Sequence, residues 1–480
     1  MKTQRREFLK WTGFAAGLGL AAKGINLGYA AETQSADKSD AVAGTKTGQT
    51  SPVQKFNMSG YAAPKIRNVR VGIIGLGQRG PSLMKNLIQV EGVEIKALCD
   101  LRPEIAERAG RILRNTDHHP ELYSGSENEW KKVCQRKDID LVVVTTPWYM
   151  HAAQSIYAMN QGKHVACEVP AAGTIEECWQ LVETAEETKQ HLMMLENYSY
   201  MWFQLLTLNM ARQGYLGEIV HADCAYNTSK LSNNFNKNLY WNMWWLRQYA
   251  NRRGNIYPTH GLGPVCQIMN INRGDRLDFL VSVESKDFTM QKKAQELAQT
   301  DKFFEEFAVK EYRGNMNTSV IRTVQGRTIM LQHDATSPSP HNLIHGIYGT
   351  EGSALYDPPP PRIGRNHRWL SDDDLNAVKG KYTPAISREY GQIARDSGHD
   401  GSDLLNIWHL IDCLRNGLPL DRDVYDAAAW SSIIPLSQWS VLNHSNSIHI
   451  PDFTAGAWKI NKPNMDIELQ NGGATTKLLV

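Results

Sequence analysis

VGIIGLGQRG, at residues 71–80, ends an apolar run in three glycines, Gly75, Gly77 and Gly80. The spacing Gly-x-Gly-x-x-Gly predicts a turn from a strand into a helix, where backbone N–H groups can face a pyrophosphate. The next apolar run, VEIKALCD at 93–100, ends on Asp100. A carboxylate there can accept the ribose hydroxyls of a dinucleotide and repel the additional phosphate of NADP. The stretch therefore predicts an NAD site of the Rossmann type.

Apolar and amphipathic segments alternate on from this point. The pattern predicts strands at 69–77, 93–100, 139–147, 164–170 and 192–197, and helices at 78–90, 102–114, 149–162 and 175–189. Such alternation is typical of a parallel sheet with right-handed crossovers and helices on both faces. We therefore predict an α/β fold that begins with a doubly wound Rossmann-type NAD-binding domain at 67–197.

The pattern changes after Asn197. A helix at 201–214 is followed by alternating strands at 219–229, 279–285, 318–334 and 345–357, the third of which is broken at Gln325-Gly326. Hairpin-connected strands favour a mostly antiparallel sheet. We predict a substrate-binding α+β domain at 198–455 and a C-terminal tail at 456–480. Helices at 403–417 and 426–444 are expected to pack on this sheet or back toward the first domain. The pattern does not indicate the oligomeric state, and a homo-oligomer is left open.

The first residues suggest export. RREFLK at 5–10 precedes a segment rich in Gly and Ala and then GYAAE at 28–32. This order resembles a twin-arginine signal over 1–31, cleaved near Ala30 or Ala31, and an ordinary Sec signal is the alternative. Residues 32–66 are small and polar, which predicts a flexible linker. No later apolar run approaches the roughly 20 residues of a membrane span, so we expect no span in the mature protein. The signal itself predicts a periplasmic or extracellular location.

Composition excludes several other classes. The chain has 480 residues and a net charge of +2, which gives no reason to expect a nucleic-acid partner. Its seven cysteines are scattered and odd in number, and no C-x-x-C pair occurs. We expect them to be buried thiols, with neither a disulfide framework nor a zinc site. No His, Asp and Glu cluster has the spacing of metal ligands, so we predict no metal.

Two segments at the carboxyl ends of predicted strands lie where open parallel sheets bind ligands. They are TTPWYMH at 145–151 and EVP at 168–170. Here the chain resembles the Gfo/Idh/MocA oxidoreductases, whose corresponding segment commonly reads Glu-Lys-Pro with a working lysine. Val169 stands in place of that lysine, and valine can neither donate a proton nor polarise a carbonyl. The usual dehydrogenase arrangement therefore lacks its cation.

Longer blocks narrow the resemblance. They are PWYMH at 147–151, CEVPAA at 167–172, MMLEN at 193–197, NIYPTHGLGPVCQIMNINRGDR at 255–276 and LQHDATSPSP at 331–340. From about residue 69 to 453 the chain resembles the NAD-dependent glycosidases of glycoside hydrolase family 109, known as α-N-acetylgalactosaminidases. The resemblance implies an exported enzyme that holds NAD tightly.

The chemistry implied by this family leaves the cofactor unconsumed. Hydride passes from C3 of the sugar to NAD, and the resulting ketone acidifies the proton on C2. Loss of that proton expels the C1 leaving group, water adds to the unsaturated ketone, and hydride returns to C3. The net reaction is hydrolysis of a glycoside, which needs no free NAD in the compartment where the enzyme works.

The resemblance also implies residue roles. His260 would take the C3 hydroxyl proton, since imidazole titrates near working pH, and Tyr257 would support it. Tyr200 would take the C2 proton, with Tyr198 as the alternative, and either would need a pKa lowered by a neighbouring cation or donor. The implied cofactor contacts are Gly75, Gly77, Gln78, Arg79, Gly80, Asp100, Trp148, His151, Glu168, Val169, Asn197 and Tyr257, and the implied substrate contacts are Tyr226, Trp245, Tyr257, Pro258, Thr259, His260 and His341.

The chain departs from the family at the sugar. Trp245 follows Trp244 where the family has a substrate-binding arginine, and Ser339 and His341 stand where an arginine and a tyrosine are usual. Exchanging a fixed cation for an indole replaces charged hydrogen bonds by stacking, which changes what is recognised. Two other functions remain open: a sugar oxidoreductase of the same superfamily, and a carbohydrate-binding protein that keeps NAD structurally.

Overall fold

Six parallel strands form the first sheet, in the order β3-β2-β1-β4-β5-β6. They are β1 (Val69–Ile74), β2 (Val93–Cys99), β3 (Glu121–Tyr123), β4 (Leu141–Val144), β5 (His164–Cys167) and β6 (Leu192–Met194). β1 pairs with β2 on one side and β4 on the other, so the strand order reverses at β1, where such sheets bind ligands. The computed structural model describes residues 53–479, and the predicted signal at 1–31 lies outside them.

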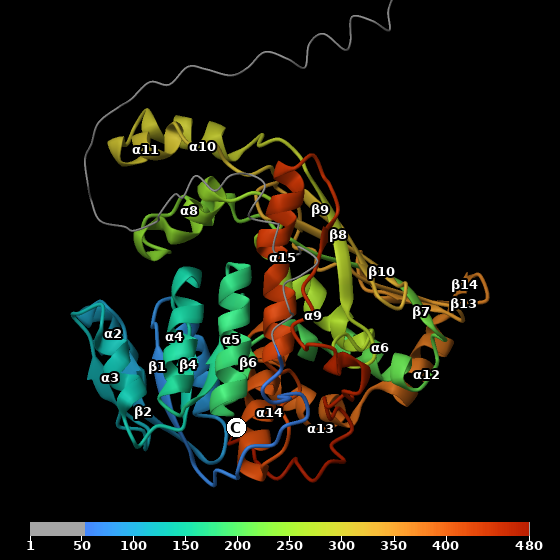
Figure 1. The fold of residues 1–480 in the computed structure, drawn as a ribbon, viewed down its shortest axis with the longest axis horizontal. Coiled ribbons are helices and arrows are strands. Elements are labelled where there is room, and N and C mark those ends of the chain that lie inside the picture. Colours follow the sequence, from blue (N-terminus) through green and yellow to red (C-terminus); the bar gives the residue numbers. More distant parts are fainter. Residues whose placement is uncertain (1–52, 480) are drawn as a thin grey trace, which may run out of the picture. The chain divides into compact units, whose positions relative to one another are not determined.

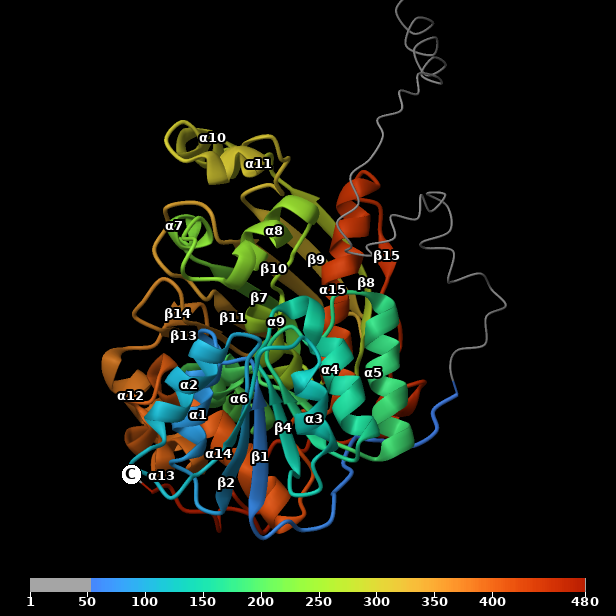
Figure 2. The same cartoon turned by 90° about the vertical axis from the view of Figure 1, so that its left-hand side faces the viewer.

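Helices cover both faces of this sheet. They are α1 (Arg79–Leu87), α2 (Pro103–Ile112), α3 (Glu129–Gln135), α4 (Trp148–Asn160) and α5 (Ile175–Thr188). α4 and α5 pack together on one face, whereas α1 lies on the other with α14 (Ser402–Asn416) (Figure 2). α5 begins at a capping box, in which Thr174 and Glu177 satisfy each other's backbone N–H groups. The predicted doubly wound parallel sheet is confirmed.

The second sheet has nine strands in the order β14-β13-β12-β11-β7-β10-β9-β8-β15. They are β7 (Ile219–Asn227), β8 (Leu277–Glu284), β9 (Asn317–Thr323), β10 (Thr328–Asp334), β11 (His345–Gly349), β12 (Ser353–Leu355), β13 (Arg362–Arg365), β14 (Arg368–Trp369) and β15 (Ile448–His449). β10 and β7 run parallel, and the other described pairs of this sheet are antiparallel. The predicted mostly antiparallel sheet is confirmed.

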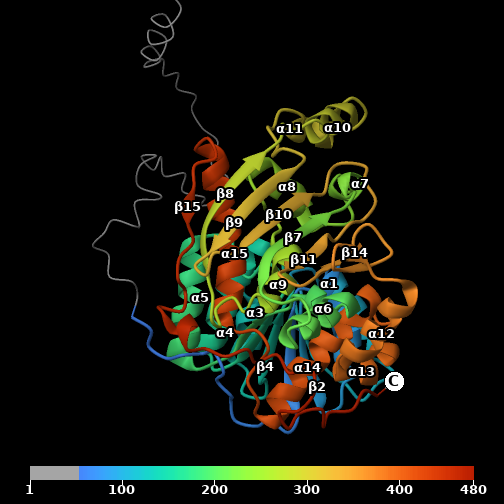
Figure 3. The same ribbon diagram turned by 90° about the vertical axis from the view of Figure 1, so that its right-hand side faces the viewer.

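Helix α15 (Val424–Leu442) connects the two sheets. It packs on α5 and on β8, as Figures 1 and 3 show. Its N-terminus is fixed by Asp423, which caps the helix and also accepts a hydrogen bond from the buried guanidinium of Arg273. The predicted packing of this helix on the sheet and toward the first domain is therefore what the structure has.

The remaining α-helices follow β6 in the chain. They are α6 (Trp202–Arg212), α7 (Leu231–Asn234), α8 (Trp244–Asn251), α9 (Thr259–Ile268), α10 (Met290–Ala298), α11 (Glu305–Ala308), α12 (Asp372–Tyr382) and α13 (Ala385–Ala394). Within residues 53–479, none of the helices has the length and apolar character needed to cross a bilayer. All seven cysteines are buried and free, as predicted.

Candidate active site

Each glycine of the loop between β1 and α1 occupies a place that excludes a side chain or leaves room for a ligand. Gly75 has φ of 93°, and a Cβ on it would lie 2.7 Å from the carbonyl carbon of Thr145. A Cβ on Gly80 would lie 2.1 Å from the carbonyl oxygen of Gly75, so glycine here lets α1 pack on β1. The backbone of Gly77 borders open space, since a Cβ there would meet only Arg102, at 3.9 Å. This loop fits the close approach of a pyrophosphate.

Asp100 is held against the same loop. Its Oδ2 accepts a hydrogen bond of 2.9 Å from the backbone N–H of Leu76, and its Oδ1 accepts one of 3.0 Å from Nε of Arg102. The guanidinium of Arg102 also lies 5.1 Å from the centroid of the Trp241 ring. The carboxylate therefore stands at the end of β2 beside the open backbone of the glycine loop, where a ribose would lie in a bound dinucleotide.

The segments after β4 and β5 lie next to each other at this edge of the sheet. The two ring nitrogens of His151 each lie 2.7 Å from a backbone carbonyl oxygen, one of Pro170 and one of Thr146. Burial lowers the pKa of His151. The imidazole therefore ties the two segments together. Next to it Trp148 stacks on Tyr257, with 5.3 Å between ring centroids and 14° between planes.

Arg79, at the start of α1, joins three parts of the chain. Its Nε donates to Glu168 at 2.7 Å, and its two Nη atoms donate to the carboxylate of Asp403 at 3.0 and 2.9 Å. Burial opposes the charge, but the two carboxylates raise the pKa of Arg79. The guanidinium therefore fixes Glu168 and the N-terminal turn of α14 beside the glycine loop.

Three other predicted cofactor residues also lie at this edge. Asn197 is buried, and its Nδ2 donates to Ser402 at 3.4 Å. Gln78 is exposed and donates to the carbonyl of Leu239 at 3.3 Å. Val169 lies two positions after the end of β5 and is buried, with 2% exposure.

His260 and Glu196 form the central pair of the site. Nδ1 of His260, in the first turn of α9, lies 2.8 and 3.0 Å from the two carboxylate oxygens of Glu196, whose side chain is fully buried. Glu196 also accepts the backbone N–H of Tyr198 at 3.0 Å. A Cβ on Gly263, three positions after His260 on α9, would lie 2.7 Å from Cγ of Glu196. The absence of a side chain at Gly263 therefore lets Glu196 lie this close to α9. The arrangement directs Nε2 of the histidine away from the carboxylate.

Three tyrosine rings surround this histidine. The ring centroid of His260 lies 4.3 Å from that of Tyr198, 4.8 Å from that of Tyr257 and 5.1 Å from that of Tyr226. Burial raises the pKa of each of the three phenols. Pro258 links Tyr257 to Thr259, the first residue of α9. Tyr257 and His260 therefore lie in the same cluster.

Tyr198 also contacts a second histidine that is paired with a carboxylate. Nδ1 of His399 lies 2.8 Å from Oδ2 of Asp403, and its ring centroid lies 5.8 Å from that of Tyr198. Burial opposes ionisation, but hydrogen bonds from His399 and Arg79 lower the pKa of Asp403. Neither His399 nor Asp403 was among the site residues predicted from the sequence. Their spacing of four positions at the start of a helix was the available signal, and it is common on helices.

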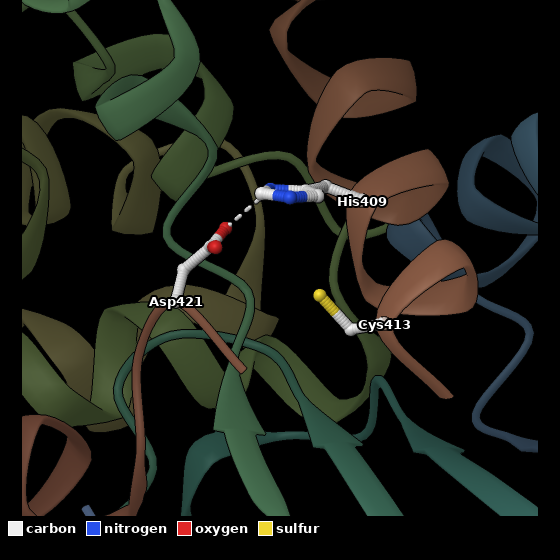
Figure 4. Close-up of side chains that lie close together, drawn as sticks. All are labelled: His409, Cys413 and Asp421. Carbon is white, nitrogen blue, oxygen red and sulfur yellow. Dashed lines mark hydrogen bonds and ion pairs between the residues drawn. The ribbon is translucent and has the colours of Figure 1, made fainter. Parts of the chain in front are cut away.

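Tyr200 does not join the cluster around His260. Its hydroxyl lies 3.0 Å from Nδ1 of His409, which also lies 2.8 Å from Asp421, and the tyrosine is 1% exposed. Figure 4 shows His409 and Asp421 with Cys413, the one group within residues 53–479 whose ligand atoms could hold a metal ion. Burial lowers the pKa of His409 to about 4 and raises that of Asp421 to about 7. Tyr200, His409 and Asp421 therefore form a buried hydrogen-bonded network.

Lys230 and His341 border the predicted substrate residues. Nζ of Lys230 lies 5.2 Å from the ring centroids of both Tyr226 and Trp245. His341 has its ring centroid 5.8 Å from that of Tyr226. Trp245 in turn lies 5.5 Å from Tyr257 and 4.8 Å from Trp148, measured between centroids. The structure thus places Tyr226, Trp245 and His341 in one neighbourhood, together with a lysine that was not among the predicted residues.

Sequence comparison relates both halves of the chain to known families. Residues 200–460 match the model of the glycosyl hydrolase 109 C-terminal domain, and residues 69–196 match that of the oxidoreductase family with an NAD-binding Rossmann fold. A glycosyl hydrolase family 109 protein of Shewanella pealeana is 42% identical and covers 96% of this chain and 99% of its own. A Bacteroides fragilis protein named Alpha-N-acetylgalactosaminidase is 45% identical, with 83% and 95% covered. One of the same name from Shewanella oneidensis is 41% identical, with 86% and 91% covered.

Solved structures show the same fold at low identity. An oxidoreductase domain protein from Kribbella flavida has a TM-score of 0.58 at 15% identity, covering 81% of this chain and 100% of its own. A levoglucosan dehydrogenase in complex with NADH has a TM-score of 0.58 at 18% identity, covering 80% and 100%. The two-domain architecture is therefore that of this group of oxidoreductases.

Proposed function

Because the chain belongs to glycosyl hydrolase family 109, we propose that it is an exported enzyme that hydrolyses α-N-acetylgalactosaminides or a related glycoside. The names of the relatives from Bacteroides fragilis and Shewanella oneidensis support this substrate class. The observation that carries the proposal is the His260–Glu196 pair, which lies at the same sheet edge as a glycine loop that fits a dinucleotide.

The residues that would hold NAD are those of the glycine loop, Asp100 at the end of β2 and Asn197 after β6. Bound there, NAD supplies a hydride acceptor, and later a hydride donor, for C3 of the sugar. Gly77 would leave the backbone open to the pyrophosphate, and Asp100 would accept hydrogen bonds from the ribose. Arg79 forms ion pairs with Glu168 and Asp403, so its role is to hold these two carboxylates in place at the carboxyl end of the first sheet.

His260 is the acid and base for the C3 hydroxyl. Because Nδ1 faces the carboxylate of Glu196, Nε2 is the nitrogen that can take the hydroxyl proton and give it back. The buried carboxylate stabilises the imidazolium that forms, as the acidic member of a catalytic triad does. Tyr257 packs edge-on against the imidazole, with 90° between planes, and restricts its orientation.

The C2 proton needs a second base. Oxidation at C3 acidifies this proton, its loss expels the C1 group, and water then adds to the unsaturated ketone before C3 is reduced again. His399 is suited to take it, because a neutral imidazole can accept a proton and Asp403 can stabilise the charged form. Tyr198 is the alternative, although burial raises its pKa and a neutral phenol is a poor base.

Export and recycling of the cofactor belong together in this proposal. Each cycle returns the hydride that it removes, so the enzyme needs no external redox partner. A chain with tightly held NAD can therefore turn over where free NAD is scarce. The twin-arginine signal predicted at 1–31 supports this, because that route carries folded proteins.

The test is release of p-nitrophenol from a panel of p-nitrophenyl glycosides of both anomers, in D2O and without added NAD. We expect release together with deuterium at C2 of the product. The variant His260→Gln keeps a side-chain amide beside Glu196 but cannot carry the proton, and should lose about 10²- to 10⁴-fold in kcat. If sugars reduce the bound cofactor without release, the protein is a sugar oxidoreductase. If they bind without either reaction, it is a carbohydrate-binding protein.

A further inference from the structure

Lys230 places an ammonium group in the substrate region with no acidic partner. It precedes α7, and its backbone N–H donates to the carbonyl of Ala335 at 3.0 Å, which fixes its Cα at the end of β10. Its side chain is half-buried, and Nζ lies 5.2 Å from the rings of Tyr226 and Trp245. Within residues 53–479, no carboxylate forms an ion pair with it.

The other cationic groups of the site are compensated. Arg79 is paired with Glu168 and Asp403 at 2.7 and 2.9 Å. His260 has Glu196 at 2.8 Å. Among the cationic groups of the site within residues 53–479, the ammonium between the two aromatic rings is therefore the one that no carboxylate contacts. A partly desolvated cation without a counter-ion favours binding of an anion, because the pairing repays the lost hydration of both groups.

We propose that Lys230 binds an anionic substituent of the substrate, a carboxylate or a sulfate, and that the enzyme prefers acidic glycosides. This inference rests on the function proposed above and names the substrate class for it. The rings of Tyr226 and Trp245 hold the ammonium by cation–π attraction. Those rings also contact Tyr257, which places the bound anion next to the reacting sugar.

His341 supplies a second group of suitable chemistry. Burial and the charge of Lys230 lower the pKa of His341, so its imidazole is neutral at pH 7. A neutral imidazole offers one N–H donor to the same anion without adding a charge that would repel the ammonium. Lys230 and His341 come from different strand ends, after β7 and β10, and meet at the ring of Tyr226.

Two variants of Lys230 and one control test the inference. Lys230→Met keeps the apolar stem over the rings and removes the charge, whereas Lys230→Arg keeps it. Arg247→Met is the control, because Arg247 is paired with Glu306 on the surface of α8. The substrates are p-nitrophenyl α-N-acetylgalactosaminide, its 6-sulfate and p-nitrophenyl α-galacturonide. We expect the ratio of kcat/KM for an acidic over the neutral glycoside to fall at least tenfold in Lys230→Met and to persist in the other two.

A binding measurement separates this inference from hydrolysis. Galacturonate and N-acetylgalactosamine 6-sulfate are titrated into wild type and variants with tryptophan fluorescence as the readout, since Trp245 lies beside the ammonium. We expect at least tenfold weaker binding in Lys230→Met, and the acid that binds more tightly identifies the anion. An unchanged ratio and unchanged binding would overturn the inference. So would loss of bound NAD from Lys230→Met, because the lysine would then serve the cofactor.

Failure of the inference differs from failure of the proposed function. If the wild type hydrolyses neutral glycosides and neither acidic one, the inference is wrong and the glycosidase stands. If none of the glycosides is hydrolysed while acidic sugars still bind through Lys230, the anion site stands and the glycosidase is wrong.

Discussion

Replacing His399 by glutamine should stop the C2 proton step and leave the C3 step intact. Nδ1 of His399 is bonded to Asp403 at 2.8 Å, whereas His260 is bonded to a different carboxylate, Glu196. Glutamine can keep a hydrogen bond to Asp403, so the position of the N-terminal turn of α14 is preserved. It cannot accept a proton, so the variant separates a base at C2 from a merely structural contact.

The expected magnitude follows from the role. Removing a positioned general base typically costs about 10²- to 10⁴-fold, which corresponds to about 3 to 5 kcal/mol of activation free energy. We expect C2 deuterium exchange and aglycone release to fall together by that factor. Oxidation at C3 should proceed within about threefold of wild type, because His260 and Glu196 are unchanged.

The assay follows both steps on the same samples. Deuterium at C2 is read by NMR in D2O, and a single turnover with excess enzyme is read by NADH absorbance. His449→Gln is the matched control, because His449 is an exposed histidine 4.0 Å from a carboxylate of Asp278 in the second sheet. C2 exchange within threefold of wild type in His399→Gln would refute the reasoning. Loss of exchange in Tyr198→Phe would then assign the base to Tyr198.

Three further outcomes follow from the contacts of the site. Glu196→Gln should lower kcat about tenfold, because a charge-assisted hydrogen bond to His260 becomes a neutral one of roughly half the strength, and stopped-flow measurement of NAD reduction checks it. Tyr200→Phe should lower the free energy of unfolding by about 1 kcal/mol through loss of the bond to His409, while kcat of the folded fraction stays near wild type; urea denaturation and active-site titration measure the two. Burial lowers the pKa of Lys230 to about 8, so binding of galacturonate should be constant below pH 7 and weaken about tenfold per unit above pH 8, as fluorescence titration will show.

The first sheet was predictable because its signals are local. β4 is a continuous apolar run, β1 is apolar except for Arg70, and the turn after β1 is marked in the sequence by the closely spaced Gly75, Gly77 and Gly80. Neither β3 nor α3 was predicted. β3 has three residues with no buried side chain, so it carries no apolar alternation. It forms only because β2 offers an edge for pairing.

The second sheet was predictable in kind but not in order. The hairpin of β9 and β10 follows from the turn at Gln325-Gly326, yet β10 pairs on its other side with β7 in parallel. More than 100 positions separate Thr328 from its partner His221 in this pairing, as their numbers show. No local pattern encodes such a pairing, because it depends on how the hairpin docks against the rest of the sheet.

The two tyrosines show why residue roles were harder to predict than the fold. Tyr198 and Tyr200 both lie in the short helical turn 197–200 and are two positions apart. Their side chains therefore leave the turn in different directions, and Tyr198 faces His260 while Tyr200 faces His409. The sequence motif places the turn correctly, but the direction of each side chain depends on the geometry of that single turn.

Charge compensation explains why the lysine could be identified only in the structure. The carboxylates that neutralise Arg79 are 89 and 324 positions away from it, so a sequence shows the charges and not their pairs. When the ion pairs within residues 53–479 are compared, Lys230 is a cation of the site to which no carboxylate is paired. Because Trp245 supplies a ring face under the ammonium, the indole and the lysine act as one unit. An aromatic residue in the place of a charged one therefore need not reduce the charge that a substrate meets, since the ring can hold a cation delivered from another strand.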